Sequence, residues 1–197
     1  MRAQRARSIW RIGGILLFGV LLALAGGCDD SSSSSSSSPS GAGGGQPTPP
    51  QTVDGASAAS GQSLADAAIA NVGKLNSNIG PQTDYGNRGC AWAVDQIVKA
   101  QTGLDFNTLS TAEMYNELRN GTGIAVDPNN PPPGAIIISP TEGDITGHVG
   151  IVGYDGLVYS NSSATATWSQ NYTVAGWHRF FDARSGTFAF VLSTAKK

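Results

Sequence analysis

The chain has 197 residues, with 12 Lys or Arg and 14 Asp or Glu side chains, and this length allows one ordinary domain. The formal net charge of −2 argues against nucleic acid as a partner, because no basic patch with interleaved aromatic side chains is present to follow phosphates. Two cysteines, Cys28 and Cys90, are too few for a disulfide framework.

The N-terminus has the pattern of an export signal. Four arginines lie within the first 11 residues, and about 16 small or apolar residues follow. This predicts a secretory signal over residues 1–27. Ala25-Gly26-Gly27-Cys28 resembles a bacterial lipobox, which implies that Cys28 is acylated and begins the mature chain. An ordinary cleaved signal and an uncleaved anchor remain alternatives, although a membrane span needs roughly 20 apolar residues.

Residues 28–56 have the composition of a flexible tether. An unbroken serine run fills residues 31–38, and stretches rich in glycine and proline follow it. Such residues bury too little apolar surface to offset the entropy of the chain. We therefore expect a globular domain over residues 57–197, anchored through lipid to a membrane of the bacterial cell envelope and facing the periplasm or cell wall. Removal of residues 1–27 would leave 8 basic and 14 acidic side chains, a formal charge of −6.

Three helices are predicted in the first half of this domain. The first covers residues 64–75, begins at a capping box over 63–66 and carries one apolar stripe. The second begins at Cys90 and ends at Gly103. A further capping box at Ser110 predicts a short helix that ends near Gly121.

The second half is predicted to be a sheet. Apolar runs at residues 135–139, 148–154, 157–162 and 188–193 have strand character, and Asp155-Gly156 is typical of a tight hairpin turn. The proline-rich stretch that precedes these runs is excluded as a central strand. Helices followed by antiparallel strands predict an α+β fold with the helices packed on one face of the sheet.

Cys90 is the candidate nucleophile. It lies at a predicted helix start, because Gly86 and Gly89 interrupt any helix upstream. Unpaired N–H groups and the helix dipole favour a thiolate there, and we expect the thiol pKa to fall from about 8.5 into the range of roughly 3.5–7.5. The alternative interpretation is that Cys90 is a small buried hydrophobic residue without a chemical role. If Cys28 carries lipid, Cys90 has no cysteine partner; a disulfide between the two is the rival.

His148 is the candidate general base, because it opens an apolar strand and histidine next to cysteine suits thiol acyl-transfer chemistry. Alternation along the strand puts Gly150 on the same face, where we expect it to leave room for the cysteine helix. His178 is the rival base. No short spacing of metal ligands is present, so we expect neither a metal ion nor another cofactor.

The sequence resembles CHAP domains, relatives of the NlpC/P60 peptidases within the papain-like fold. Arg88-Gly89-Cys90-Ala91-Trp92-Ala93-Val94 is similar to their Gly-x-Cys-Thr-x-Tyr-Val stretch. Pro133-Gly134-Ala135-Ile136-Ile137 and Gly147-His148-Val149-Gly150-Ile151-Val152 are similar to Pro-x-x-Gly-Asp-Ile and Gly-His-Val-Ala-Ile-Val, except that Ala135 replaces the usual acid. The resemblance covers about residues 80–165 and implies N-terminal helices packed on an antiparallel sheet.

The resemblance also suggests residues that assist the pair. Tyr159-Ser160-Asn161 is similar to a Glu-x-Asn stretch without its acid, which makes Asn161 our orienting residue for His148 and Ser160 the alternative. Related enzymes place a tyrosine or glutamine upstream of the nucleophile, so Tyr85 and Gln82 are oxyanion candidates. Trp92 and Trp168 are candidates for a substrate groove or for core packing, and Glu142 and Asp144 are read as solvated loop acids.

The function implied by the resemblance is hydrolysis of amide bonds in peptidoglycan through a Cys90 thioester. The bond would be one within the stem peptide or the amide between N-acetylmuramic acid and L-alanine. A thiol acyltransferase on the same fold and a non-catalytic wall-binding lipoprotein with a decayed site are the alternatives. The partners implied are peptidoglycan and, through lipid, the membrane; protein partners are left open.

Overall fold

The structure is a computed structural model that describes residues 55–143 and 145–193. The predicted signal over 1–27, the lipidation site Cys28 and nearly all of the predicted tether over 28–56 lie outside the described residues. Among the residues described, no helix combines the length and apolar character that a membrane crossing requires.

The described chain forms an antiparallel sheet with the strand order β1-β6-β2-β3-β4-β5. The strands are β1 Gly123–Val126, β2 Ile136–Ser139, β3 His148–Val152, β4 Leu157–Ser162, β5 Thr167–Thr173 and β6 Phe188–Leu192. The helices are α1 Gly55–Ala70, α2 Cys90–Thr102, α3 Thr111–Glu117 and α4 Val174–Phe181, with short turns of helix at η1 Pro81–Gly86, η2 Leu118–Thr122 and η3 Tyr154–Gly156.

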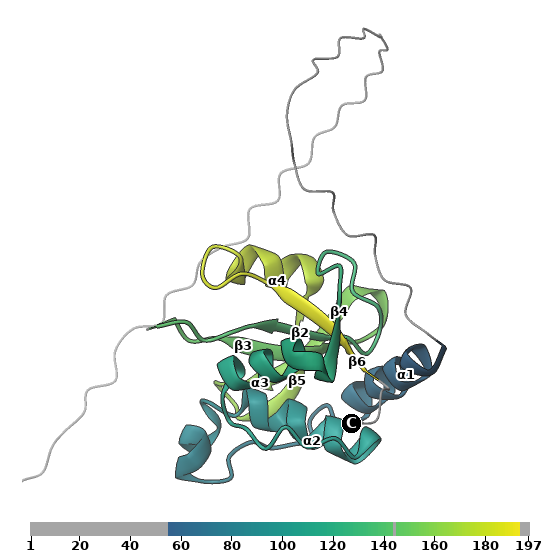
Figure 1. The fold of residues 1–197 in the computed structure, drawn as a ribbon. Coiled ribbons are helices and arrows are strands. Elements are labelled where there is room, and N and C mark those ends of the chain that lie inside the picture. Colours follow the sequence, from purple (N-terminus) through teal and green to yellow (C-terminus); the bar gives the residue numbers. More distant parts are fainter. Residues whose placement is uncertain (1–54, 144, 194–197) are drawn as a thin grey trace, which may run out of the picture. The chain divides into compact units, whose positions relative to one another are not determined.

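Helices cover both faces of the sheet. The helices α1, α2 and α3 pack on one face and α4 packs on the other, so Figure 1 shows α4 on one side of the strands and α2 and α3 on the opposite side. The predicted α+β class is confirmed, and the three predicted helices pack on one face of the sheet as expected. The helix α4 on the other face was not predicted. Its apolar residues Val174, Trp177 and Phe181 recur at helical spacing and are buried against the strands.

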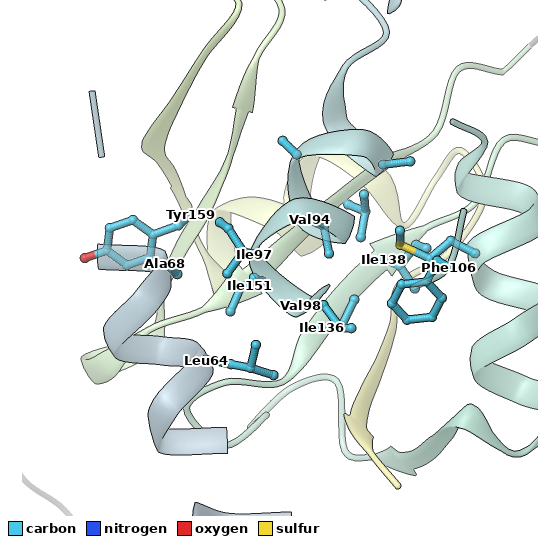
Figure 2. Close-up of a cluster of buried hydrophobic side chains, with 14 of the residues drawn as sticks. Leu64, Ala68, Val94, Ile97, Val98, Phe106, Ile136, Ile138, Ile151 and Tyr159 are labelled. Carbon is cyan, nitrogen blue, oxygen red and sulfur yellow. The ribbon is translucent and has the colours of Figure 1, made fainter. Parts of the chain in front are cut away.

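The larger core lies between α1, α2 and the sheet. Figure 2 shows apolar side chains of the two helices meeting those of the strands, among them Leu64, Val94, Val98 and Ile151. Trp168 of β5 is fully buried in the same core, and its Nε1 donates a hydrogen bond of 2.8 Å to the carbonyl oxygen of Ala68. This indole therefore has a packing role, the second of the two roles considered for it.

The first helix differs from the prediction at both ends. It begins at Gly55, so Ser63 lies inside it, and the Ser63 hydroxyl donates to Gln101 Oε1 instead of capping the helix. The helix ends at Ala70, because the chain turns at residues 71–74 and Gly73 adopts a positive φ of 70°. Ile69 and Val72, two apolar residues within the predicted range of 64–75, are exposed and do not extend the buried stripe.

The other predicted elements agree more closely. The helix α2 spans the predicted residues and ends at Gly103 in the left-handed conformation, and Ser110 Oγ accepts a hydrogen bond from the Glu113 N–H at the start of α3. The hairpin is confirmed, since Asp155 and Gly156 both have positive φ, as a type I′ turn requires. Strands β1 and β5 were not predicted; β1 is an edge strand next to the proline-rich segment.

Ile151→Ala should lower the free energy of unfolding by about 2–5 kcal/mol, because it leaves a cavity in the larger core where Ile151 is fully buried. Ile69→Ala is the matched control: the same atoms are removed from a side chain that is 39% exposed, and the loss should be below about 1 kcal/mol. Urea unfolding measures both. Equal losses would contradict the described core.

Candidate active site

Cys90 is the first residue of α2, and the loop before it is held by close packing. A Cβ atom on Gly89 would collide with the side chain of Ser77, and one on Gly86 would collide with Ala166. Gly86 also has a positive φ of 98°, which disfavours any residue with a side chain. Both glycines are thus needed for the chain to reach the helix start along this path.

Asn161 ties this loop to the sheet. The Asn161 Nδ2 donates a hydrogen bond of 3.0 Å to the Gly86 carbonyl oxygen, and Ser77 Oγ donates one of 2.6 Å to Asn161 Oδ1. Both Asn161 and Ser77 are buried, so the loss of either partner would leave a polar group without water or hydrogen bond. Asn161 therefore positions the chain just before Cys90.

The Cys90 side chain packs against the edge of the larger core and is only partly exposed. Burial raises the pKa of its thiol to about 11, although backbone N–H groups of Ala91, Cys90 and Val149 point at the sulfur and oppose this rise. The expected low thiol pKa is therefore wrong for this state of the site, because desolvation of the thiolate outweighs the N–H groups at the helix start.

The His148 side chain lies on the face of the sheet that α4 covers, opposite the larger core beneath α2. Its Nε2 is 3.1 Å from Ser160 Oγ, and Asn171 Nδ2 donates a hydrogen bond of 2.9 Å to the same oxygen. The predicted orienting role of Asn161 does not fit this geometry. Side chains alternate along β4, so Ser160 points to the His148 face and Asn161 to the face of Ser77. Ser160, the alternative, makes the contact.

Three aromatic rings enclose the His148 imidazole. Trp177 stacks on it with ring centroids 5.3 Å apart, Phe181 stacks at 5.8 Å, and Tyr172 meets it edge-on at 5.9 Å. Burial lowers the pKa of His148 to about 4, so the ring is neutral at pH 7. Two of the three rings belong to α4, the helix that the sequence pattern did not predict.

Cys90 and His148 approach each other at the start of β3. The sulfur lies next to the N–H of Val149, the residue that follows His148, while no hydrogen bond among the described residues joins the two side chains directly. The expectation for Gly150 is wrong: α2 packs on the face of Val149 and Ile151, and a Cβ on Gly150 would instead meet β4 at Tyr159 O and Ser160.

The oxyanion candidates lie on the turn before the nucleophile loop. Tyr85 is 63% exposed with a positive φ of 53° in η1, and Gln82 is exposed with its Nε2 donating to the Ile79 carbonyl oxygen. Neither has a hydrogen bond to Cys90 among the described residues. Trp92 is half-buried against the larger core. The functional roles given to these three residues stay predictions.

His178 lies apart from the Cys90 helix. Burial opposes protonation, but hydrogen bonds to the Pro128 carbonyl oxygen (2.8 Å) and Asp182 (3.0 Å) raise the pKa of His178 above its usual value. His178 also borders a shallow pocket together with Asp155. His178 is thus hydrogen-bonded to a carboxylate and a carbonyl oxygen, whereas His148 contacts the Ser160 hydroxyl. Glu142 is exposed, whereas Asp144 lies outside the described residues.

The sequence reasoning missed several residues of the site. Ser77, Asn171, Tyr172 and Trp177 were not singled out, yet each contacts Asn161, Ser160 or His148. The apolar spacing of residues 174–181 was the one available indication of α4. Ser77 and Asn171 lie in polar stretches without a pattern. Within the described residues, no group of three His, Cys, Asp or Glu side chains is arranged to hold a metal ion.

Comparison with known families identifies the domain that carries these residues. A family model described as the CHAP domain matches residues 80–170. These residues form a CHAP domain. The match includes Cys90, His148, Ser160 and Asn161 and confirms the predicted family. CHAP domains are typically cysteine hydrolases or amidases that act on peptidoglycan, so an activity of this general type is indicated. No curated protein matched the chain.

The half-buried His148, desolvated by the surrounding rings, should make the CHAP domain less stable in mild acid. Its pKa is lowered to about 4 in the folded chain from an ordinary value of 6.5, so the unfolded chain binds the proton first as the pH falls. Stability should therefore drop between pH 6.5 and 4, by roughly 3 kcal/mol. Denaturant unfolding across this range measures it, and His148→Gln should flatten the dependence. If the free energy of unfolding of His148→Gln fell with pH as steeply as that of the unchanged chain, the desolvation of His148 would be contradicted.

Ser160→Asp should raise the pKa of His148, because a carboxylate would replace the neutral hydroxyl 3.1 Å from Nε2. Asn161→Asp is the matched control: it adds the same charge on the other face of β4 and should shift the His148 pKa less. NMR titration of the imidazole protons distinguishes the two variants. A larger shift in Asn161→Asp would restore Asn161 as the orienting residue.

Proposed function

We propose that the chain is a peptidoglycan hydrolase in which Cys90 attacks an amide carbonyl and His148 acts as base and then as acid. The observation that supports this most directly is the position of the Cys90 sulfur against the backbone N–H that follows His148, within a CHAP domain. The nucleophile and the base thus come from a helix start and a strand start that meet, as the chemistry requires.

The resting pair is neutral. The raised pKa of Cys90 and the lowered pKa of His148 leave a thiol and an uncharged imidazole at pH 7. In this proposal, the proton leaves the sulfur for His148 Nδ1 as the C–S bond forms, so that no isolated thiolate is needed. This requires the tautomer in which Nε2–H donates to Ser160 Oγ, an oxygen that can also accept the Asn171 N–H.

The later steps use the same groups. The N–H groups of Cys90 and Ala91 point toward the sulfur and can stabilise the oxyanion that develops beside it. His148 then returns the proton to the leaving amine as the C–N bond breaks. Water attacks the thioester carbonyl, His148 takes its proton and passes it to the departing sulfur, and the products are a carboxylic acid and free enzyme.

The finer identity of the substrate is part of the proposal. The bond would be an amide within the stem peptide or the N-acetylmuramoyl-L-alanine amide. Export through residues 1–27, acylation of Cys28 and the tether over 28–56 would hold the enzyme at a membrane of the cell envelope, facing the periplasm or wall. Peptidoglycan would then lie within reach of the CHAP domain.

One observation favours a second candidate, a wall-binding lipoprotein without activity. Ser160 gives His148 no negative charge, and three aromatic rings cover much of the imidazole. A positively charged intermediate on His148 therefore lacks the carboxylate that often stabilises such a ring. Binding to peptidoglycan without release of fragments would identify this candidate.

Cys90→Ala should abolish the release of fragments from purified peptidoglycan, and His148→Gln should reduce it by at least about 10³-fold, because the nucleophile or its base is lost. His178→Gln is the matched control and should leave the rate near that of the unchanged chain. Mass spectrometry of the fragments measures the loss and identifies the cleaved bond. Full activity in Cys90→Ala would refute the thioester mechanism, and a product joined to an added amine would indicate acyl transfer.

A further inference from the structure

We propose that Arg184, Phe180 and Tyr172 form a subsite beside His148 that binds a carboxylate of the peptide substrate. This inference rests on the proposed function, because it assigns a specificity-determining residue to the same site. The three residues are called the arginine subsite below.

The guanidinium of Arg184 packs on an aromatic ring and has no acidic partner among the residues that the structure describes. Its central carbon lies 4.1 Å from the centroid of the Phe180 ring, a cation–π contact on a ring that is 46% exposed. Among the ion pairs of the described residues none includes Arg184. Asp182, two residues away, accepts hydrogen bonds from His178 and Thr187 instead. A guanidinium stacked on one face keeps its N–H edge available for a carboxylate.

The arginine subsite is continuous with the rings around the candidate base. The Phe180 ring lies 6.3 Å from that of Tyr172, and Tyr172 lies 5.9 Å from His148. Burial raises the pKa of Tyr172 while the positive charge of Arg184 opposes the rise, so the guanidinium lies close enough to act on this phenol. A ligand could therefore extend from His148 across Tyr172 and Phe180 to the Arg184 charge.

Charge complementarity favours a carboxylate as the occupant. The chain carries more acidic than basic side chains, so acidic partners for an arginine are numerous. Arg184 nevertheless pairs with none among the described residues, which leaves its charge available to a ligand. Stem peptides of peptidoglycan carry free carboxylates close to their amide bonds. A bidentate pair with Arg184 would fix the peptide in register, while Phe180 and Tyr172 would contact its apolar parts.

The test compares two probes on the full-length chain: a muropeptide with free carboxylates and the same muropeptide with its carboxylates converted to carboxamides. Arg184→Gln should raise the KM for the free-carboxylate probe by about tenfold or more with little change in kcat, and should leave the KM for the amidated probe nearly unchanged. The unchanged chain should prefer the free-carboxylate probe.

Arg119→Gln is the matched control. Arg119 makes a similar cation–π contact, 5.4 Å from the Tyr115 centroid, but Tyr115 belongs to the α3 side of the sheet, away from α4. The Arg119→Gln variant should leave the KM for both probes unchanged. Equal KM values for both probes in the unchanged chain would overturn the arginine subsite. The subsite would also be overturned if Phe180→Leu raised the KM equally for both probes while Arg184→Gln had no effect. That result is expected for a surface that binds sugar rings.

A binding measurement separates this proposal from the proposed function. Calorimetry with the Cys90→Ala chain needs no hydrolysis: tighter binding of the free-carboxylate muropeptide, lost in Cys90→Ala/Arg184→Gln, supports the arginine subsite even if the unchanged chain releases no fragments. Equal binding of both probes overturns it even if hydrolysis is observed. Thermal unfolding of each variant checks that the CHAP domain is intact.

Discussion

The burial of strand β3 on both faces is the constraint on which the site depends. Side chains alternate along a strand, so His148 lies among the rings of α4 and β5 while Val149 faces the core beneath α2. The N–H between these two residues points at the Cys90 sulfur. One peptide unit thus connects the two halves of the candidate pair, and a shift of one residue in the register of β3 would separate them.

Burial also explains why both groups are uncharged at rest. Both side chains are largely desolvated although each keeps some exposed surface, and desolvation disfavours the thiolate and the imidazolium alike. In the proposed reaction, such an environment would strengthen the interaction of the fixed N–H groups with the negative charge that develops beside the sulfur. Ser160 keeps the surroundings of His148 uncharged as well, because its hydroxyl contacts the ring where a carboxylate would add a buried charge.

The polar residues around the pair have two separate tasks that lie on opposite faces of β4. Ser160 and Asn171 hold the imidazole, while Asn161 and Ser77 hold the loop that leads to Cys90. Neighbouring residues of one strand therefore position His148 and the loop before Cys90 independently. This arrangement makes β4 as important to the candidate site as α2 and β3, which carry Cys90 and His148.

The sequence by itself determined the features that depend on short-range patterns: the helix that starts at Cys90, the strand that starts at His148, the Asp155-Gly156 hairpin and the CHAP-like motifs. Glycines, caps and apolar periodicity act over a few residues, which is why they can be read without the fold. The tertiary structure alone decided which face each side chain occupies, that α4 covers the imidazole, that Ser160 rather than Asn161 contacts it, and that the thiol pKa rises. These properties depend on burial by segments distant in sequence, and desolvation by such segments cannot be deduced from local pattern.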